Sequence, residues 1–446
     1  MKASRVLFLD IRPLRGNRPF RSLWVGSAAS GLGGQVATVA VLAQVWELTG
    51  SPVGTGAIGL ATGLPMVLFG LLGGTLADTL DRRAIVRAAT AGQLLAAGGL
   101  FVQALADNRN VLLLLCLVAM GAACGALGAP ARRTFPVRLL PPDQVAAGLA
   151  LTNIAFQATM LAGPALAGLI IARWDFPAAY AVQAVAVALA MFAVSRLPVM
   201  KPEGAVAEGA DADVAGAGSG RRRPRHGGWR VILRRPTLWG AMATDLSATL
   251  LAMPIALFPL VNEVRFDGDP QNLGLFLSAV AVGGIAAGLL SGTVTRWRRG
   301  GLVQLAAAGA WGLALACFGL SAELWTALAC LAVAGAADTV SVVTRSAMVQ
   351  WETPDAYRGR VSSVEHVIGV AGPELGNFRG GLLASATSAP FALVSGGLSA
   401  ALAIAAVAAA NAPLRAYRTP APAAAPTASP AAGRRRADDR RAASRP

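Results

Sequence analysis

Twelve apolar runs, each long enough to cross a lipid bilayer, follow one another along this chain. About 30 Å of hydrocarbon takes roughly 20 helical residues to cross, whereas a spanning strand needs about ten, so runs of this length predict helices. The expected spans are 22–46, 53–77, 84–106, 110–130, 144–172, 178–197, 238–261, 273–295, 301–320, 324–349, 360–386 and 390–411. We therefore expect an all-α integral membrane protein with twelve transmembrane helices.

The composition argues against most classes of soluble protein. Hydrophobic residues make up 55% of the chain and charged residues 14%, and the mean hydropathy is +0.56. A soluble domain usually carries nearer a quarter charged residues. The net charge of +16 would suggest nucleic-acid binding in a soluble chain, but here the arginines lie between apolar runs. That placement favours a role in membrane topology, and we expect no nucleic-acid partner.

The placement of arginine predicts the orientation of the chain in the membrane. Loops on one side, together with both termini and the central linker, hold most of the arginines: Arg82, Arg83, Arg132, Arg133, Arg138, Arg296, Arg298, Arg299, Arg358 and Arg360. The opposite loops hold Arg109, Arg173 and Arg265. Because basic loops remain in the cytoplasm, we expect a multi-pass protein of the cell membrane with both termini cytoplasmic.

Sequence matches at a nearly constant offset indicate an internal duplication. The segment Gly70–Asp78 returns about two hundred residues later as Gly288–Arg296. Further pairs follow in the same order: Arg18-Pro19 and Arg235-Pro236, Gly121-Ala122-Ala123 and Gly335-Ala336-Ala337, Pro142-Asp143 and Pro354-Asp355, Gly163-Pro164 and Gly372-Pro373. In a membrane protein, two similar halves around a central site are the usual construction of a transporter.

The duplication and the composition divide the chain into five parts. These are an N-terminal cytoplasmic segment at 1–21, a six-helix bundle at 22–197, a cytoplasmic linker at 198–236, a second six-helix bundle at 237–412 and a basic tail at 413–446. The linker and the tail lack apolar periodicity, so we expect both to be disordered. Their basic runs either bind a partner or, more simply, lie solvated near anionic lipid.

These residues resemble the major facilitator superfamily, and the resemblance covers roughly residues 15–412. The segment Gly74–Arg83 is similar to the superfamily's signature loop between helices 2 and 3. It departs from that pattern at Thr79, where a basic residue is usual, and at Asp81, where a glycine is usual. The resemblance implies two pseudo-symmetric six-helix bundles that alternate between inward and outward openings.

Within the superfamily the chain resembles the enterobactin-exporter-like drug and siderophore exporters. The similar segments are Asp338–Arg345, Thr353–Val361 and Gly372–Gly376. Other drug-antiporter branches usually carry an arginine within helix 4, about where Leu117 stands here. Its absence argues against those branches and against a proton mechanism copied from them.

The resemblance implies a gate at the cytoplasmic ends of helices 2 and 11. Asp78 would lie against the positive N-terminal end of helix 11 and hold the two halves together while the cavity opens outward. Gly74 would allow close approach of a neighbouring helix. The gate residues are Gly74, Asp78, Arg82, Arg83, Arg358 and Arg360. The alternatives are a solvated helix-end carboxylate for Asp78 and topogenic charge for Arg82 and Arg83.

Two Gly-Pro pairs at repeat-related positions, Gly163-Pro164 and Gly372-Pro373, lie inside predicted helices 5 and 11. Proline removes an amide donor and bends a helix, and glycine permits close packing. We expect these residues to act as helix hinges during alternating access, or else as static kinks.

Ionisable residues inside apolar helices are costly and mark functional sites. The candidates for proton coupling or substrate binding are Asp245, Asp338, Arg345, Glu365 and Glu374. Asp245 and Asp338 fall near mid-depth, and the resemblance places both on cavity-lining helices, so they form the leading pair. The alternative for each candidate is a structural hydrogen bond or ion pair between helices. Asp338 and Arg345 share a helix face, which makes an ion pair along that helix feasible. Glu365 and Glu374 lie on opposite faces, so at most one should face the cavity.

Nothing in the sequence resembles a phosphate loop, a catalytic triad or a metal cluster, so we expect no enzyme, no cofactor and no metal. The predicted function is a proton-driven exporter of a small amphipathic molecule, such as a drug, an antibiotic or a siderophore. The expected partners are that substrate, protons and the lipid bilayer, and we expect a monomer. The alternatives are a proton-coupled importer of a small solute and a non-transporting receptor on the same fold.

Overall fold

The computed structural model describes residues 10–198, 228–290, 298–354 and 357–419. Within these ranges, the side chains of residues 71, 74–75, 77–79, 228–230 and 358–360 lie outside the described part. The described secondary structure consists of helices and contains no strand. The predicted fold class, an all-α membrane protein, is confirmed.

The first group of helices comprises α1 (Arg12–Gly16), α2 (Arg18–Thr49), α3 (Pro52–Thr79), α4 (Arg82–Leu105), α5 (Val111–Arg133), α6 (Phe135–Leu139) and α7 (Val145–Ser195). Short polar side chains set the starts of its long helices. Asn17, Ser51, Asp81 and Asn110 each accept a backbone amide from the first turn of the helix that follows. Helix starts therefore lie within about four residues of the predicted ones.

The second group comprises α8 (Gly228–Arg234), α9 (Pro236–Ala252), η1 (Ile255–Leu257), α10 (Phe258–Arg265), α11 (Pro270–Leu289), α13 (Gly300–Leu320), α14 (Leu324–Glu352), α15 (Arg358–Ala386), α16 (Ala389–Ala410) and α17 (Ala412–Ala416). Two short helices lie where disorder was predicted. Ile232 of α8 and Leu414 of α17 are buried, so that prediction is wrong for these residues because each helix has an apolar anchor. Residues 199–227 and 420–446 lie outside the described part.

Ten helical stretches are long and apolar enough to cross a membrane. One of them, α7, has 51 residues and a non-helical backbone at Asp175 (φ 65°, ψ −177°), so it contains two spans. The 29-residue α15 is less apolar because it carries the ionisable side chains of the sequence's predicted span 360–386. Counting α7 as two spans and adding α15 to the ten stretches gives twelve spans, which agrees with the number predicted.

The predicted span 238–261 is not one continuous helix. It breaks at Met253 and Pro254, after α9 ends and before η1 begins. Proline has no amide to continue the helical hydrogen bonds. Side chains of α15 satisfy the exposed backbone: Arg379 Nη1 donates to the carbonyl of Leu251 at 2.7 Å, and Asn377 Oδ1 accepts the amide of Ala256 at 3.2 Å.

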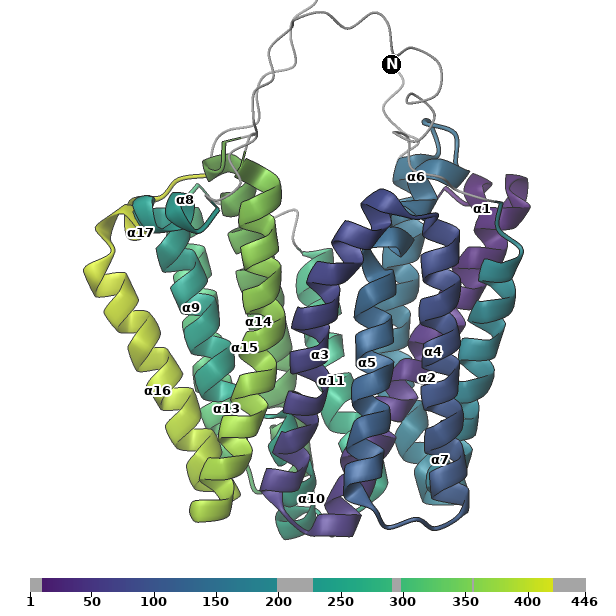
Figure 1. Ribbon diagram of the computed structural model, residues 1–446. Coiled ribbons are helices and arrows are strands. Elements are labelled where there is room, and N and C mark those ends of the chain that lie inside the picture. Colours follow the sequence, from purple (N-terminus) through teal and green to yellow (C-terminus); the bar gives the residue numbers. More distant parts are fainter. Residues whose placement is uncertain (1–9, 199–227, 291–297, 355–356, 420–446) are drawn as a thin grey trace, which may run out of the picture.

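The two groups of helices stand side by side, with α1, α6, α8 and α17 at one face, here called the terminal face, and α10 at the opposite face (Figure 1). The groups pack together through α3 against α15 and α7 against α11. Near the opposite face, Thr55 Oγ1 donates to the carbonyl of Ala256 at 2.7 Å. A Cβ added at Gly274 would collide with the carbonyl of Pro164, so small residues allow this approach.

Candidate functional site

A cavity of about 400 Å³ lies between the two groups of helices. The first group contributes uncharged side chains to its wall, including Gln35, Gln157 and Met160. The second group contributes three ionisable side chains, which are Asp245 on α9 and Asp338 and Arg345 on α14. Charge in this cavity therefore comes from one half of the molecule.

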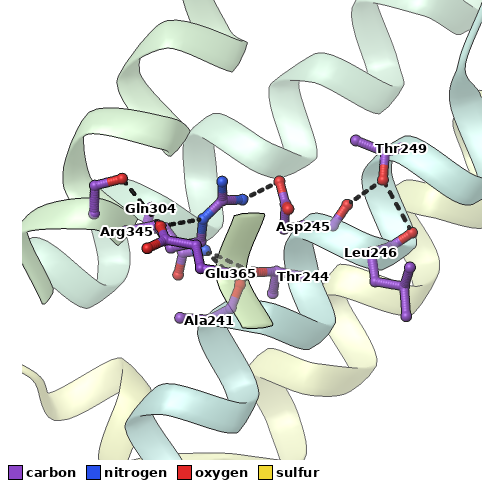
Figure 2. A network of polar contacts seen from close by, with 9 residues as sticks. Ala241, Thr244, Asp245, Leu246, Thr249, Gln304, Arg345 and Glu365 are labelled. Atoms are coloured by element: carbon purple, nitrogen blue, oxygen red, sulfur yellow. Dashed lines mark hydrogen bonds and ion pairs between the residues drawn. The ribbon is translucent and has the colours of Figure 1, made fainter. Parts of the chain in front are cut away.

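A buried ion network joins three helices at this wall. Arg345 of α14 is 5% exposed and forms an ion pair with Asp245 of α9, which is 7% exposed (Figure 2). Its Nε also lies 3.5 Å from Oε1 of Glu365 on α15. Ser346 Oγ donates to the same Glu365 oxygen at 3.0 Å. One cation is thus shared by two carboxylates, which compensates the cost of burying it.

Asp338 lines the same cavity but has a different environment. Its carboxylate forms no hydrogen bond or ion pair within the described residues, and Asp245 and Arg345 are near enough to act on it electrostatically. The ion pair along the helix between Asp338 and Arg345, which the sequence made feasible, is not formed in the structure. The two residues lie seven positions apart, about 10 Å along the axis, whereas Asp245 contacts Arg345 directly from another helix.

Neutral polar side chains that the sequence analysis did not single out hold α9 in place. Gln304 of α13 donates through Nε2 to Thr244 Oγ1 at 2.6 Å and to the carbonyl of Ala241 at 3.3 Å (Figure 2). Within α9 itself, Thr249 Oγ1 donates to the carbonyl of Asp245 at 2.9 Å. Gln304 is fully buried in an apolar helix, and that sequence context was the signal that could have identified it.

Glu374 lies away from the cavity, in the packed interface between α15 and α3. Its side chain contacts Thr62 and Asn377, and a Cβ added at Gly59 or Gly63 would come close to or collide with it. Glu365 and Glu374 thus face different neighbours, as their spacing predicts. Neither lines the cavity wall, and Glu365 is linked to it through Arg345.

The predicted gate falls partly on residues whose side chains the structure does not describe. The side chains of Gly74, Asp78, Arg358 and Arg360 lie outside the described part, although their backbones belong to α3 and α15. Arg82 and Arg83 begin α4, and Arg83 Nη2 donates to the carbonyl of Ser195 at 2.6 Å. That bond joins α4 to the end of α7, so it lies within the first group of helices rather than between the groups.

The predicted hinge residues lie at close helix contacts. A Cβ at Gly163 would collide with Gln35, and one at Gly372 would collide with Thr249. Pro164 and Pro373 both line the central cavity, and α7 and α15 continue through them as helices. The interruptions that the structure contains lie elsewhere, at Asp175 and at Pro254.

Two helix groups around a charge-lined cavity are the architecture of secondary transporters, and solved structures share it. The nucleoside transporter NupG has a TM-score of 0.69 at 13% identity, with 88% of this chain and 99% of that chain covered. A bacterial homologue of the iron transporter ferroportin, in an inward-facing state, has a TM-score of 0.66 at 16% identity, with 89% and 99% covered. These likenesses show the fold.

The sequence itself identifies the family. A family model described as transmembrane secretion effector matches residues 10–432, so the chain belongs to this family of major facilitator superfamily transporters. The enterobactin exporter EntS of Citrobacter koseri is 24% identical over 389 residues, with 87% of this chain and 91% of the relative covered. EntS of Shigella flexneri is also 24% identical, with 87% and 90% covered. The predicted family resemblance is confirmed.

Proposed function

We propose that this transporter is a proton-driven exporter of a small amphipathic molecule such as a siderophore or a drug. The observation that carries the proposal is the buried arginine shared by two carboxylates from two other helices. The relatives named as enterobactin exporters support the direction of transport and the class of substrate.

The charge balance of the network supports a role in proton coupling. Arg345 carries one positive charge, and ionised Asp245 and Glu365 carry two negative charges. One proton therefore neutralises the three residues together and weakens one of the two links between α14 and its neighbours. Asp338, with no ion-pair partner in the described part, provides a second place for a proton or for a cationic group of the substrate.

The packing of the two halves supports an inward-facing arrangement. We place the terminal face in the cytoplasm, because most arginines of the loops lie there. The halves then contact each other near the external face, through Thr55 and Ala256 and through Gly274 and Pro164. In this arrangement the substrate enters the cavity from the cytoplasm, and proton binding from outside follows after the external contacts open.

Accumulation in proteoliposomes tests the proposal. Liposomes containing the purified protein and an acidic lumen should accumulate radiolabelled enterobactin or ethidium, because protons leave as substrate enters. Asp245→Asn and Asp338→Asn should each abolish that accumulation. Asp107→Asn, an exposed carboxylate at the opposite face, is the matched control and should transport normally. Accumulation at the wild-type level in both cavity variants would overturn the assignment.

The same liposomes distinguish the alternatives. An importer driven by proton symport should accumulate solute when the exterior, rather than the lumen, is acidic. A non-transporting receptor should accumulate neither compound with either gradient. Failure of the wild-type protein to accumulate either enterobactin or ethidium would reject both proposed substrate classes.

A further inference from the structure

A second cavity lies near the opposite face, between the two groups of helices. Its volume is about 850 Å³, and it is lined by the ends of α2 and both limbs of α7 and by the segment from α10 to α11. Five carboxylate side chains share its wall: Glu47, Asp175, Glu263, Asp267 and Asp269. The wall contains no Lys, Arg or His, although the chain has 39 Lys and Arg against 23 Asp and Glu.

These carboxylates have no cationic partner within the described residues. Two of them accept backbone amides: Asp175 Oδ1 accepts from Phe176 at 2.7 Å, and Asp269 Oδ1 accepts from Gln271 at 2.8 Å. Arg265 is close in sequence, but its guanidinium donates to the carbonyl of Ser321 at 2.7 Å. Like charges at the wall of one cavity repel each other unless a cation lies between them.

A buried amide supplies an independent indication of a ligand. Asn262 lines the same cavity and is 2% exposed. Its Nδ2 donates to the carbonyl of Asp269 at 2.9 Å, whereas its buried Oδ1 has no hydrogen-bond partner. A buried acceptor without a donor is unfavourable, so a ligand with an N–H group would complete the site.

The remaining wall fits an organic cation better than a metal ion. Trp46 and Phe176, from different helices, line the cavity together with Ile171 and Leu273. Aromatic faces attract cations, and apolar side chains bury hydrocarbon. Among the described residues, no three His, Cys, Asp or Glu side chains are placed as metal ligands.

We propose that this cavity is a binding site for protonated amines attached to an apolar scaffold. Glu47 and Asp175 come from the first group of helices, and Glu263 and Asp267 from the second. A bound amine therefore bridges the halves and stabilises the arrangement in which this face is closed. On the proposed orientation this face is external, so external amines inhibit export by holding the transporter inward-facing.

Binding of a fluorescent amine to the purified full-length protein tests the site. Monodansylcadaverine carries a primary amine on an apolar ring, and its uncharged analogue dansylamide is the ligand control. The variant Glu47→Gln/Glu263→Gln removes two charges from exposed positions in the cavity. The matched control Asp107→Asn/Glu323→Gln removes two exposed charges outside the cavity wall.

Fluorescence anisotropy should show an affinity about tenfold weaker in the cavity variant, because two of the five carboxylates that attract the amine are lost. The control variant should bind as the wild type does, and dansylamide should not bind. Equal affinities in the cavity variant and the wild type would overturn the proposal, as would equal binding of dansylamide.

A third variant separates this site from the proposed transport function. The inference rests on that function only for its orientation and its inhibitory effect, because binding is measured without a pH gradient. Asp338→Asn removes the central-cavity carboxylate that the proposed function assigns to a proton or a cationic substrate group. Binding lost in this variant therefore belongs to the central cavity, and binding lost only in Glu47→Gln/Glu263→Gln belongs to the second cavity. Loss of binding in Asp338→Asn, with binding kept in Glu47→Gln/Glu263→Gln, would place the amine in the central cavity and reject the second site.

Discussion

The two halves of the molecule repeat one architecture but have different polar interiors. In the first half, Gln103 Nε2 and the hydroxyl of Tyr180 both donate to Gln44 Oε1, at 3.0 and 2.8 Å, and all three residues are uncharged at neutral pH. In the second half, Arg345 is shared by Asp245 and Glu365. Neutral hydrogen bonds survive a change of pH, whereas one proton changes the balance of an ion network. On the proposed function, this part of the first half would act as a frame, and the network of the second half would respond to protons.

The largest effect is expected from removing the shared cation. Arg345→Met leaves the buried Asp245 without its ion-pair partner and leaves the partly buried Glu365 with only the hydrogen bond from Ser346, so we expect a loss of about 3–5 kcal/mol in unfolding free energy and no transport. Thermal unfolding in detergent measures the stability. The variant Asp245→Asn/Arg345→Met/Glu365→Gln has no unpaired charge and should recover stability but not transport. An unchanged unfolding temperature in Arg345→Met would contradict this role.

A second test asks whether the halves move as units. Gly274→Val places side-chain atoms against the carbonyl of Pro164, so the contacts between the halves near the opposite face should not close. We expect the protein to fold and to lose most of its transport, with a cysteine introduced at Ser278 alkylated several-fold faster from outside. Gly288→Val, where a Cβ meets nothing within 4 Å, is the control. Equal alkylation in Gly274→Val and Gly288→Val would show that the halves do not separate here.

A third test concerns Glu374, a carboxylate of the second half that does not belong to the ion network around Arg345. Glu374→Gln keeps the shape and the contacts with Thr62 and Asn377 but cannot ionise. In the wild type, ionised Glu374 would place a charge between packed helices, which is costly, so high pH should favour opening of this interface. The variant lacks this charge, so its interface should stay closed at higher pH than that of the wild type. The alkylation rate of a cysteine introduced at Ser278, measured from pH 5 to pH 9, should therefore rise less with pH in Glu374→Gln than in the protein that keeps Glu374. An unchanged pH profile would remove Glu374 from coupling.

The smallest effect is expected in the first half. Gln103→Leu removes one donor to Gln44 and leaves the bond from Tyr180, so a cost of about 1–2 kcal/mol is expected. The pH dependence of transport should not change, because no charge is lost. A shifted pH profile in this variant would contradict the division of roles between the halves.

The sequence predicted the helices well because crossing a membrane sets their length. The spans, the duplication and the family followed from run lengths and repeated motifs. The break after Met253 had a signal in Pro254, but an apolar run conceals where the helix ends. Short anchors such as Ile232 were also missed, because one apolar residue in a basic linker gives no periodicity.

The partners of the ionisable residues were harder to predict. Arg345 lies on one helix, and its partners lie on two others, so their pairing depends on how the three helices are rotated and shifted relative to one another. The carboxylates of the amine site are further apart still: Glu47 and Asp269 are separated by most of the first half and the linker. In the sequence alone, each of these carboxylates looks like a solvated residue near the end of a helix.

The connection at Asp175 has a mechanical consequence. A single residue with a positive φ joins the two limbs of α7, with no loop between them to absorb a displacement. If the first limb tilts away from α11, we expect the second limb to swing with it and α2 and α4, which pack against α7, to follow. This one-residue connection should therefore couple the movements of the two limbs, and lengthening it by a few glycines should let one limb open without the other.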